Sequence, residues 1–230
     1  NHPHETESPA RIKAEGVECA FPGPIILLIR HASTADTVLA SVLIANTHRM
    51  LLRFVLKREL LWDPCLDVVG NRLPNVFVDR SGQHTDRELS CIRELATGMG
   101  QRDGVLIYPE GTRFYPRKLE TIRAKLSATE PPEIMSRVNA MRNVLPPRMG
   151  GFSAAVEGAP EADIVICAHT GFEAAVNFRQ FWRGDLIGKT VHVNFRRIAA
   201  REIPGDHMKR KEWLLDRWLE VDRWTTAHKP

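Results

Sequence analysis

A chain of 230 residues, 43% of them hydrophobic and 26% charged, has the composition of a globular protein and the length of one large α/β domain. The formal net charge of +4 and the pI near 9.0 indicate an anionic partner, whether nucleic acid, a membrane surface or a phosphorylated small molecule. Four scattered cysteines without a Cys-x-x-Cys pair argue against a disulfide framework and a zinc site, so we expect no metal and a reducing compartment.

Residues 1–20 are predicted to form an N-terminal arm on the surface, because they are polar and contain Pro3 and Pro9. The domain is expected to occupy 21–230. No apolar run reaches the roughly 18 residues that a membrane-spanning helix needs. Because the chain begins at Asn1 and not at a methionine, we expect a fragment that a signal or a membrane anchor can precede.

The apolar run at 25–29 is predicted to be a buried strand, since it is short, rich in β-branched residues and preceded by the turn at 21–24 (FPGP). A helix is expected at about 34–48. Ser33 is a candidate N-cap for it, and Asp36 follows three positions later, which is the spacing of a capping box.

Further strands are predicted at 52–60, 75–79, 104–108, 163–168 and 190–198, further helices at 61–71, 86–96, 117–126, 133–144, 152–158 and 206–224, and a rigid loop at 145–151. Strands that alternate with helices predict a single α/β domain with a mostly parallel sheet flanked by helices. The strand at 190–198 alternates as an exposed strand would. The closing helix places Trp213, Leu214 and Trp218 on one face, and we favour packing on the core over a place at a membrane interface.

His31 and Asp36 follow the first buried strand, at the end where α/β sheets carry catalytic groups. A histidine can act as a general base if a carboxylate fixes its tautomer and stabilises the imidazolium. On one straight helix, residues five apart diverge by about 140°. The pair therefore requires His31 to precede the helix and Asp36 to lie in its first turn. The alternative is that Asp36 only caps the helix and His31 is an ordinary polar residue.

Glu110, Gly111, Thr112 and Arg113 follow the strand predicted at 104–108. An arginine offers a bidentate fork for a phosphate, and a glycine lets the backbone approach a ligand closely. A glutamate can accept hydrogen bonds from substrate hydroxyls. Taken alone, the tetrapeptide is better explained as a turn that carries a surface ion pair.

Together these motifs resemble a known family. The His31-x4-Asp36 pattern, the apolar stretch at 73–80 (LPNVFVDR) ending in Arg80, and the Pro-Glu-Gly-Thr-Arg motif at 109–113 look like the first three motifs of the PlsC-type glycerolipid acyltransferases. Their order and spacing also agree, and the resemblance covers roughly 23–171. It implies a fold like that of glycerol-3-phosphate acyltransferase.

The resemblance further implies acyl transfer from acyl-CoA or acyl carrier protein to the free hydroxyl of a lysophospholipid, with 1-acyl-sn-glycerol 3-phosphate expected as the acceptor and phosphatidate as the product. His31 would be the base and Asp36 would orient it. The expected acceptor-binding residues are Arg80, Glu110, Gly111, Thr112, Arg113 and Arg148. No cofactor is expected besides the thioester co-substrate. The domain is expected to act at a membrane surface, on the cytoplasmic face.

Three places depart from the family pattern. The stretch at 164–171 (IVICAHTG) lacks the proline of the fourth motif, and His169 in it is either a second candidate base or a structural histidine. The bulky basic segment 114–118 follows the glutamate motif and resembles the branch that acts on larger phospholipids. Arg148 is either a third phosphate ligand or a surface arginine after two prolines.

Three rival functions remain open from the sequence. The first is acyl transfer to another lysolipid or to a glycolipid, and the second is a thioesterase in which His31 activates water. The third is a catalytically silent lipid-binding scaffold, against which the intact His31 and Asp36 argue. Nucleic-acid binding is set aside, because the sequence has no helix-turn-helix, zinc-finger or aromatic-strand motif.

Overall fold

In the described part of the chain, the central sheet has seven strands. The computed structural model describes residues 11–33, 36–57, 75–78, 85–174 and 183–229. The strands lie in the order β1-β7-β6-β2-β5-β3-β4, and all neighbours pair in parallel except β6 and β7. Their bounds are Arg11–Glu15 (β1), Ile25–Ile29 (β2), Leu51–Lys57 (β3), Val76–Val78 (β4), Asp103–Ile107 (β5), Asp163–Thr170 (β6) and Thr190–Ile198 (β7). The predicted α/β domain with a mostly parallel sheet is confirmed.

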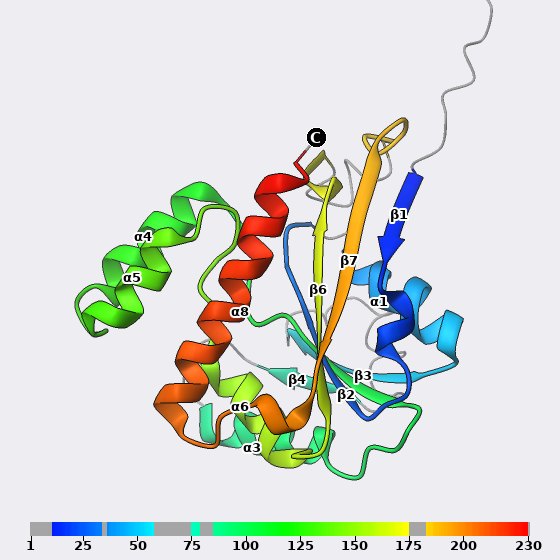
Figure 1. Ribbon diagram of the computed structural model, residues 1–230, viewed down its shortest axis with the longest axis horizontal. Helices are drawn as coiled ribbons and strands as arrows, with labels where there is room; N and C mark the ends of the chain where they lie inside the picture. Colours follow the sequence, from blue (N-terminus) through cyan, green and yellow to red (C-terminus); the bar gives the residue numbers. More distant parts are fainter. Residues whose placement is uncertain (1–10, 34–35, 58–74, 79–84, 175–182, 230) are drawn as a thin grey trace, which may run out of the picture.

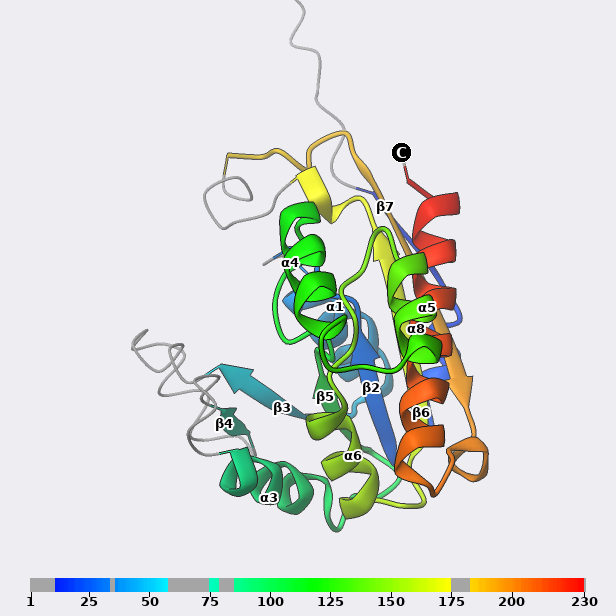
Figure 2. The same cartoon turned by 90° about the vertical axis from the view of Figure 1, so that its left-hand side faces the viewer.

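Helices cover both faces of this sheet (Figures 1 and 2). On one face lie α3 (Thr85–Ala96), α6 (Met149–Gly158) and α8 (His207–Ala227), and on the other lies α1 (Thr37–Ala40), which continues as the π-helical turn η2 (Ser41–Asn46). Figure 1 shows α4 (Pro116–Leu126) and α5 (Pro132–Ala140) side by side, away from the sheet. The 3-10 helices are η1 (Val17–Ala20), η4 (Phe172–Ala174) and η5 (Ala200–Glu202).

β2 is the central strand, and all five of its residues are fully buried. Ile26 and Leu28 pack in the core beneath α3, α6 and α8, whereas Ile25, Leu27 and Ile29 pack beneath α1 and η2. A parallel strand covered on both faces needs apolar residues at every position, which is why its sequence is a continuous apolar run. The residues that follow β2 therefore leave the sheet from its middle.

Several predicted boundaries differ from the structure. Residues 11–15, expected in a surface arm, form the exposed edge strand β1 and pair in parallel with β7. β7 is not an exposed strand, because it lies between β1 and β6 and buries alternate residues. α5 ends at Ala140 and not at 144, where the chain turns extended, and α6 begins inside the predicted loop. The predicted helix at 61–71 lies outside the described residues.

The closing helix α8 packs on the core, as predicted. Asp206 caps it by accepting a hydrogen bond from the Lys209 N–H at 2.9 Å. Leu214 and Trp218 are fully buried, and Trp213 packs against the same cluster. Within the part of the chain that the structure describes, no helix has the length and apolar character to cross a membrane.

Candidate active site

The carboxyl ends of β2, β5 and β6 meet at one edge of the sheet and carry the candidate site. β2 lies between β5 and β6 and runs parallel to both, with Leu28 opposite Ile107 and Ile29 opposite Cys167. His31 follows β2, the glutamate motif follows β5, and His169 is the penultimate residue of β6. The parallel register thus brings together segments that lie about eighty and about 140 residues apart in the sequence.

His31 and Asp36 form a pair. Nδ1 of His31 lies 3.1 Å from Oδ1 and 3.3 Å from Oδ2 of Asp36. The helix begins only at Thr37, so His31 precedes it and the Asp36 carboxylate reaches back, as the spacing requires. The Asp36 side chain is fully buried, while that of His31 is 17% exposed. Because a carboxylate accepts, the pairing favours the imidazole tautomer with the proton on Nδ1 and leaves Nε2 able to accept a proton.

Asp36 also closes the turn that precedes the helix. Its Oδ2 accepts hydrogen bonds from the backbone N–H groups of Ala32 at 2.7 Å and Ser33 at 2.8 Å. Burial favours the neutral form, but the hydrogen bond from His31, the nearby His169 and the Ser33 N–H outweigh it and lower the pKa of Asp36 below its ordinary value. Asp36 therefore caps the turn and also orients His31. The sequence offered a capping role and a pairing role as alternatives, and this one carboxylate makes both sets of contacts.

Glu110 lies at the expected edge of the sheet, with its side chain turned into the protein. Its side chain is buried, and its two oxygens accept hydrogen bonds from the backbone N–H of His31 at 3.0 Å and of Leu145 at 2.8 Å. Burial raises the pKa of Glu110 to about 8, although these two bonds and the Arg30 guanidinium favour the charged form. Both oxygens of this enclosed carboxyl group thus contact the backbone, and the contact with His31 fixes the segment that carries the candidate base. The expected role of Glu110 in acceptor binding stays a prediction.

The turn after Glu110 brings Arg148 beside the motif. Gly111 has φ +70°, and a Cβ there would lie 3.1 Å from Arg148 Nε, so only glycine lets the guanidinium approach the backbone this closely. The Arg148 N–H donates to the Pro109 carbonyl at 2.8 Å, and its side chain is exposed. Thr112 Oγ1 accepts a hydrogen bond from Lys118 Nζ at 2.8 Å. Arg113 is half-buried in the same turn.

The structure thus gathers His31, Asp36, Glu110, Gly111, Thr112, Arg113 and Arg148 at one edge of the sheet. Arg80 lies outside the described residues. Among the described residues, no group of three or more histidine, cysteine, aspartate or glutamate side chains is placed to hold a metal ion.

Sequence reasoning missed Arg30, which is buried at the end of β2. Its Nη1 donates to Glu173 Oε1 at 2.6 Å and to the His169 carbonyl at 2.8 Å, and its Nη2 donates to the Asn143 carbonyl at 3.0 Å. The available signal was a charged residue directly after a strand with no polar position. Tyr108 was missed as well: its ring centroid lies 4.6 Å from that of His31.

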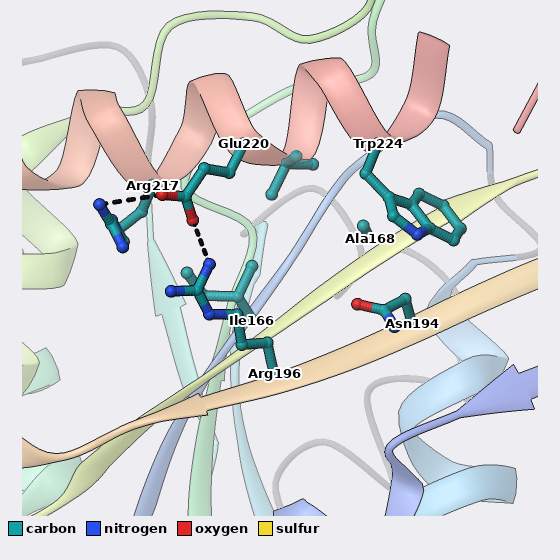
Figure 3. Close-up of a pocket in the computed structure, with 8 residues that line it drawn as sticks. Ile166, Ala168, Asn194, Arg196, Arg217, Glu220 and Trp224 are labelled. Carbon is teal, nitrogen blue, oxygen red and sulfur yellow. Dashed lines mark hydrogen bonds and ion pairs between the residues drawn. The ribbon is translucent and has the colours of Figure 1, made fainter. Parts of the chain in front are cut away.

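A cavity of about 140 Å³ lies between α8 and the β6–β7 pair, on the face of the sheet that α3, α6 and α8 cover (Figure 3). Figure 3 shows Arg196 and Arg217 sharing Glu220 on one side of this cavity and Trp224 on the other. Ala168 of β6 faces the cavity, whereas the next residue, His169, faces Asp36. The sheet therefore separates this cavity from the His31–Asp36 pair.

The fold is an α/β domain that carries a histidine–carboxylate pair, His31 and Asp36, at the carboxyl edge of its sheet. Residues 11–170 match the family model described as Acyltransferase, and the chain belongs to that family. The resemblance seen in the sequence motifs is confirmed.

Two relatives illustrate the similarity. Mouse 1-acyl-sn-glycerol-3-phosphate acyltransferase epsilon is 25% identical over an alignment of 216 residues that covers 86% of this chain and 56% of the mouse protein. The chain thus spans about half the length of this curated relative. The crystal structure of the 1-acyl-sn-glycerophosphate (LPA) acyltransferase PlsC from Thermotoga maritima aligns with a TM-score of 0.59 at 17% identity, over 95% of this chain and 72% of that one. At this identity the match shows the shared fold.

Proposed function

We propose that this domain transfers an acyl group from a thioester to the free hydroxyl of a lysophospholipid, with 1-acyl-sn-glycerol 3-phosphate as the acceptor and phosphatidate as the product. The observation that carries the proposal is the 3.1 Å contact between His31 Nδ1 and the buried Asp36 carboxylate. A charged Asp36 stabilises the imidazolium that forms when His31 takes a proton. The name of the mouse relative supports the choice of acceptor.

In the proposed reaction, His31 Nε2 removes the proton from the acceptor hydroxyl as the oxygen attacks the thioester carbonyl. The tetrahedral intermediate then collapses, the carbon–sulfur bond breaks, and the leaving thiolate takes the proton from His31. The products are the ester and the free thiol. The acyl group passes directly between the substrates, so no covalent acyl-enzyme forms and no cofactor is required.

The acceptor phosphate is proposed to bind at the turn around Gly111. Arg148 lies against this turn, and Arg113 belongs to it. Arginine forks bind phosphate oxygens in a bidentate manner. Arg80, which ends the second motif, is proposed as a further ligand from its place in the sequence, and Thr112 and the Gly111 backbone complete the set.

The substrates imply where the reaction takes place. An acyl-chain-bearing acceptor resides in a bilayer, so the carboxyl edge of the sheet is proposed to face a membrane surface, on the cytoplasmic side. The donor is proposed to be acyl-CoA or acyl carrier protein in its acylated form, both of which are soluble thioesters.

A thiol-release assay tests this function. Palmitoyl-CoA and palmitoyl-acyl carrier protein are each supplied with lysophosphatidate, with lysophosphatidylcholine, with monoacylglycerol and without acceptor. We expect release that depends on lysophosphatidate and is lost in His31→Ala. Preference for another lysolipid would replace the acceptor, and release without acceptor would indicate a thioesterase. Tight lipid binding without any release would favour a silent scaffold.

A further inference from the structure

His169, in β6, lies beside Asp36 and is fully buried. Its Nε2 is 2.7 Å from the carbonyl oxygen of Arg30 and 3.6 Å from Oδ2 of Asp36. A carbonyl oxygen only accepts hydrogen bonds, so the proton of the neutral imidazole must be on Nε2. This N–H is therefore directed at the peptide that precedes His31 and lies beside the carboxylate that orients His31.

The contact between His169 and Arg30 is reciprocal. The side chain of His169 donates to the carbonyl of Arg30, and the side chain of Arg30 donates to the carbonyl of His169 at 2.8 Å. Arg30 is 1% exposed, and its remaining donors bind Glu173 and the Asn143 carbonyl. Two opposed hydrogen bonds thus tie the end of β2 to the end of β6, one residue before His31.

We propose that His169 is a positioning residue for the acyl transfer, holding the Arg30–His31 peptide and the Asp36 carboxylate in the geometry in which His31 acts as base. This inference rests on the function proposed above. His169 does not touch a substrate, since its side chain has no exposed surface. The sequence left open whether His169 is a second catalytic base or a structural histidine. A base needs access to the acceptor, whereas Nε2 of His169 is buried and hydrogen-bonded to the Arg30 carbonyl.

The surroundings of His169 keep it neutral. Burial lowers the pKa of its imidazole and the Arg30 guanidinium lowers it further, while Asp36 and Glu173 oppose this effect. Phe172 packs edge-on against the ring with centroids 5.5 Å apart. Nδ1 has no hydrogen-bond partner among the described residues, so a second proton would have no acceptor.

Two substitutions distinguish the effect of the His169 N–H donor from the effect of its side-chain volume. His169→Gln keeps an N–H donor at about the reach of Nε2, whereas His169→Met keeps an apolar side chain of similar length without a donor. We expect His169→Met to lower kcat about ten- to a hundredfold with both KM values unchanged, as for the loss of a hydrogen bond that aligns a reacting group. His169→Gln should lie within about fivefold of wild type. His192→Met, on neighbouring β7, is the matched control and should not change kcat.

A measurement independent of turnover uses ¹⁵N-labelled histidine. In the wild type we expect the neutral imidazole of His169 to be the Nε2–H tautomer and that of His31 to be the Nδ1–H tautomer. In His169→Met, His31 should become a mixture of tautomers, and in His169→Gln it should not. If the wild type shows no acyl transfer, the proposed function fails. These spectra still decide whether His169 holds His31 in a single tautomer.

Three results would overturn the inference. One is a wild-type His169 that carries its proton on Nδ1, which is readable even if the variants do not fold. Another is a folded His169→Met protein in which His31 keeps a single tautomer. The third is an effect on KM alone, with kcat unchanged.

Discussion

Glu110 has a buried carboxyl group that accepts hydrogen bonds from two backbone N–H groups. Its pKa of about 8 means that its charge changes around neutral pH. Its ordinary pKa is 4.5, so the folded state holds the proton more tightly than the unfolded chain. The stability gained from this proton is complete below about pH 4.5 and is lost as pH rises through 8. The slope between these values is about 1.4 kcal/mol per pH unit.

Glu110→Gln cannot ionise, so the free energy of unfolding of the wild type should fall relative to that of this variant between pH 5 and 8. Urea denaturation at half-unit intervals measures the difference, with the exposed Glu161→Gln as control. The variant should also be less stable at pH 5, because its amide NH₂ meets one of the two backbone N–H donors. Parallel curves for Glu110→Gln and wild type would mean that the backbone hydrogen bonds keep Glu110 ionised.

Gly111 and Gly98 share a left-handed backbone, with φ values of +70° and +68°, but differ in their surroundings. A Cβ on Gly111 would press on Arg148, whereas one on Gly98 would meet nothing within 4 Å. Alanine at either position should cost about 1–2 kcal/mol of stability from the backbone alone. Only Gly111→Ala should also raise the KM for lysophosphatidate several-fold, because it displaces the Arg148 guanidinium. Equal KM values in the two variants would remove Arg148 from acceptor binding.

Helix α6 is positioned by its crossing with α3, and this crossing in turn places Arg148, which directly precedes α6. A Cβ on Gly158 would lie 2.2 Å from the Arg93 carbonyl oxygen, so Gly158→Ala must push the helices apart. We expect a loss of about 1–3 kcal/mol in the free energy of unfolding. At Gly151 the nearest atom to a Cβ is Ile92 Cδ1 at 3.6 Å, so Gly151→Ala should gain about 0.5–1 kcal/mol. Denaturant titration of both variants checks the pair, and equal losses would contradict this crossing.

Elements with strong local patterns were predictable. The unbroken apolar run of β2 and the helical spacing of apolar residues in α3 and α8 predict these elements, because the pattern of burial is visible in consecutive residues. β1 was missed because all five of its residues are exposed, so it has no apolar alternation to read. β7 was taken for an exposed strand because alternation does not reveal whether a strand lies at an edge or between two neighbours.

At the scale of the whole molecule, the His31–Asp36 pair could be predicted because the two residues lie only five positions apart. The contacts of the neighbouring Arg30 could not be predicted. Arg30 binds Asn143 and Glu173, which lie 113 and 143 residues further along, and such contacts exist only once the sheet has assembled. The motif placed Glu110 at the correct edge of the sheet, but its bonds to the backbone N–H groups of His31 and Leu145 were not predicted, since a motif indicates proximity without showing which way a side chain turns.

The measurement that tests the central claim most directly is single-turnover formation of ¹⁴C-phosphatidate from labelled palmitoyl-CoA and lysophosphatidate. It compares the wild type with His31→Ala and with His48→Ala, a half-buried histidine that binds the Val17 carbonyl. We expect His31→Ala to lower the rate by about 10²–10⁴-fold and His48→Ala to leave it unchanged. Phosphatidate formed by His31→Ala at the wild-type rate would contradict the assignment of His31 as the base.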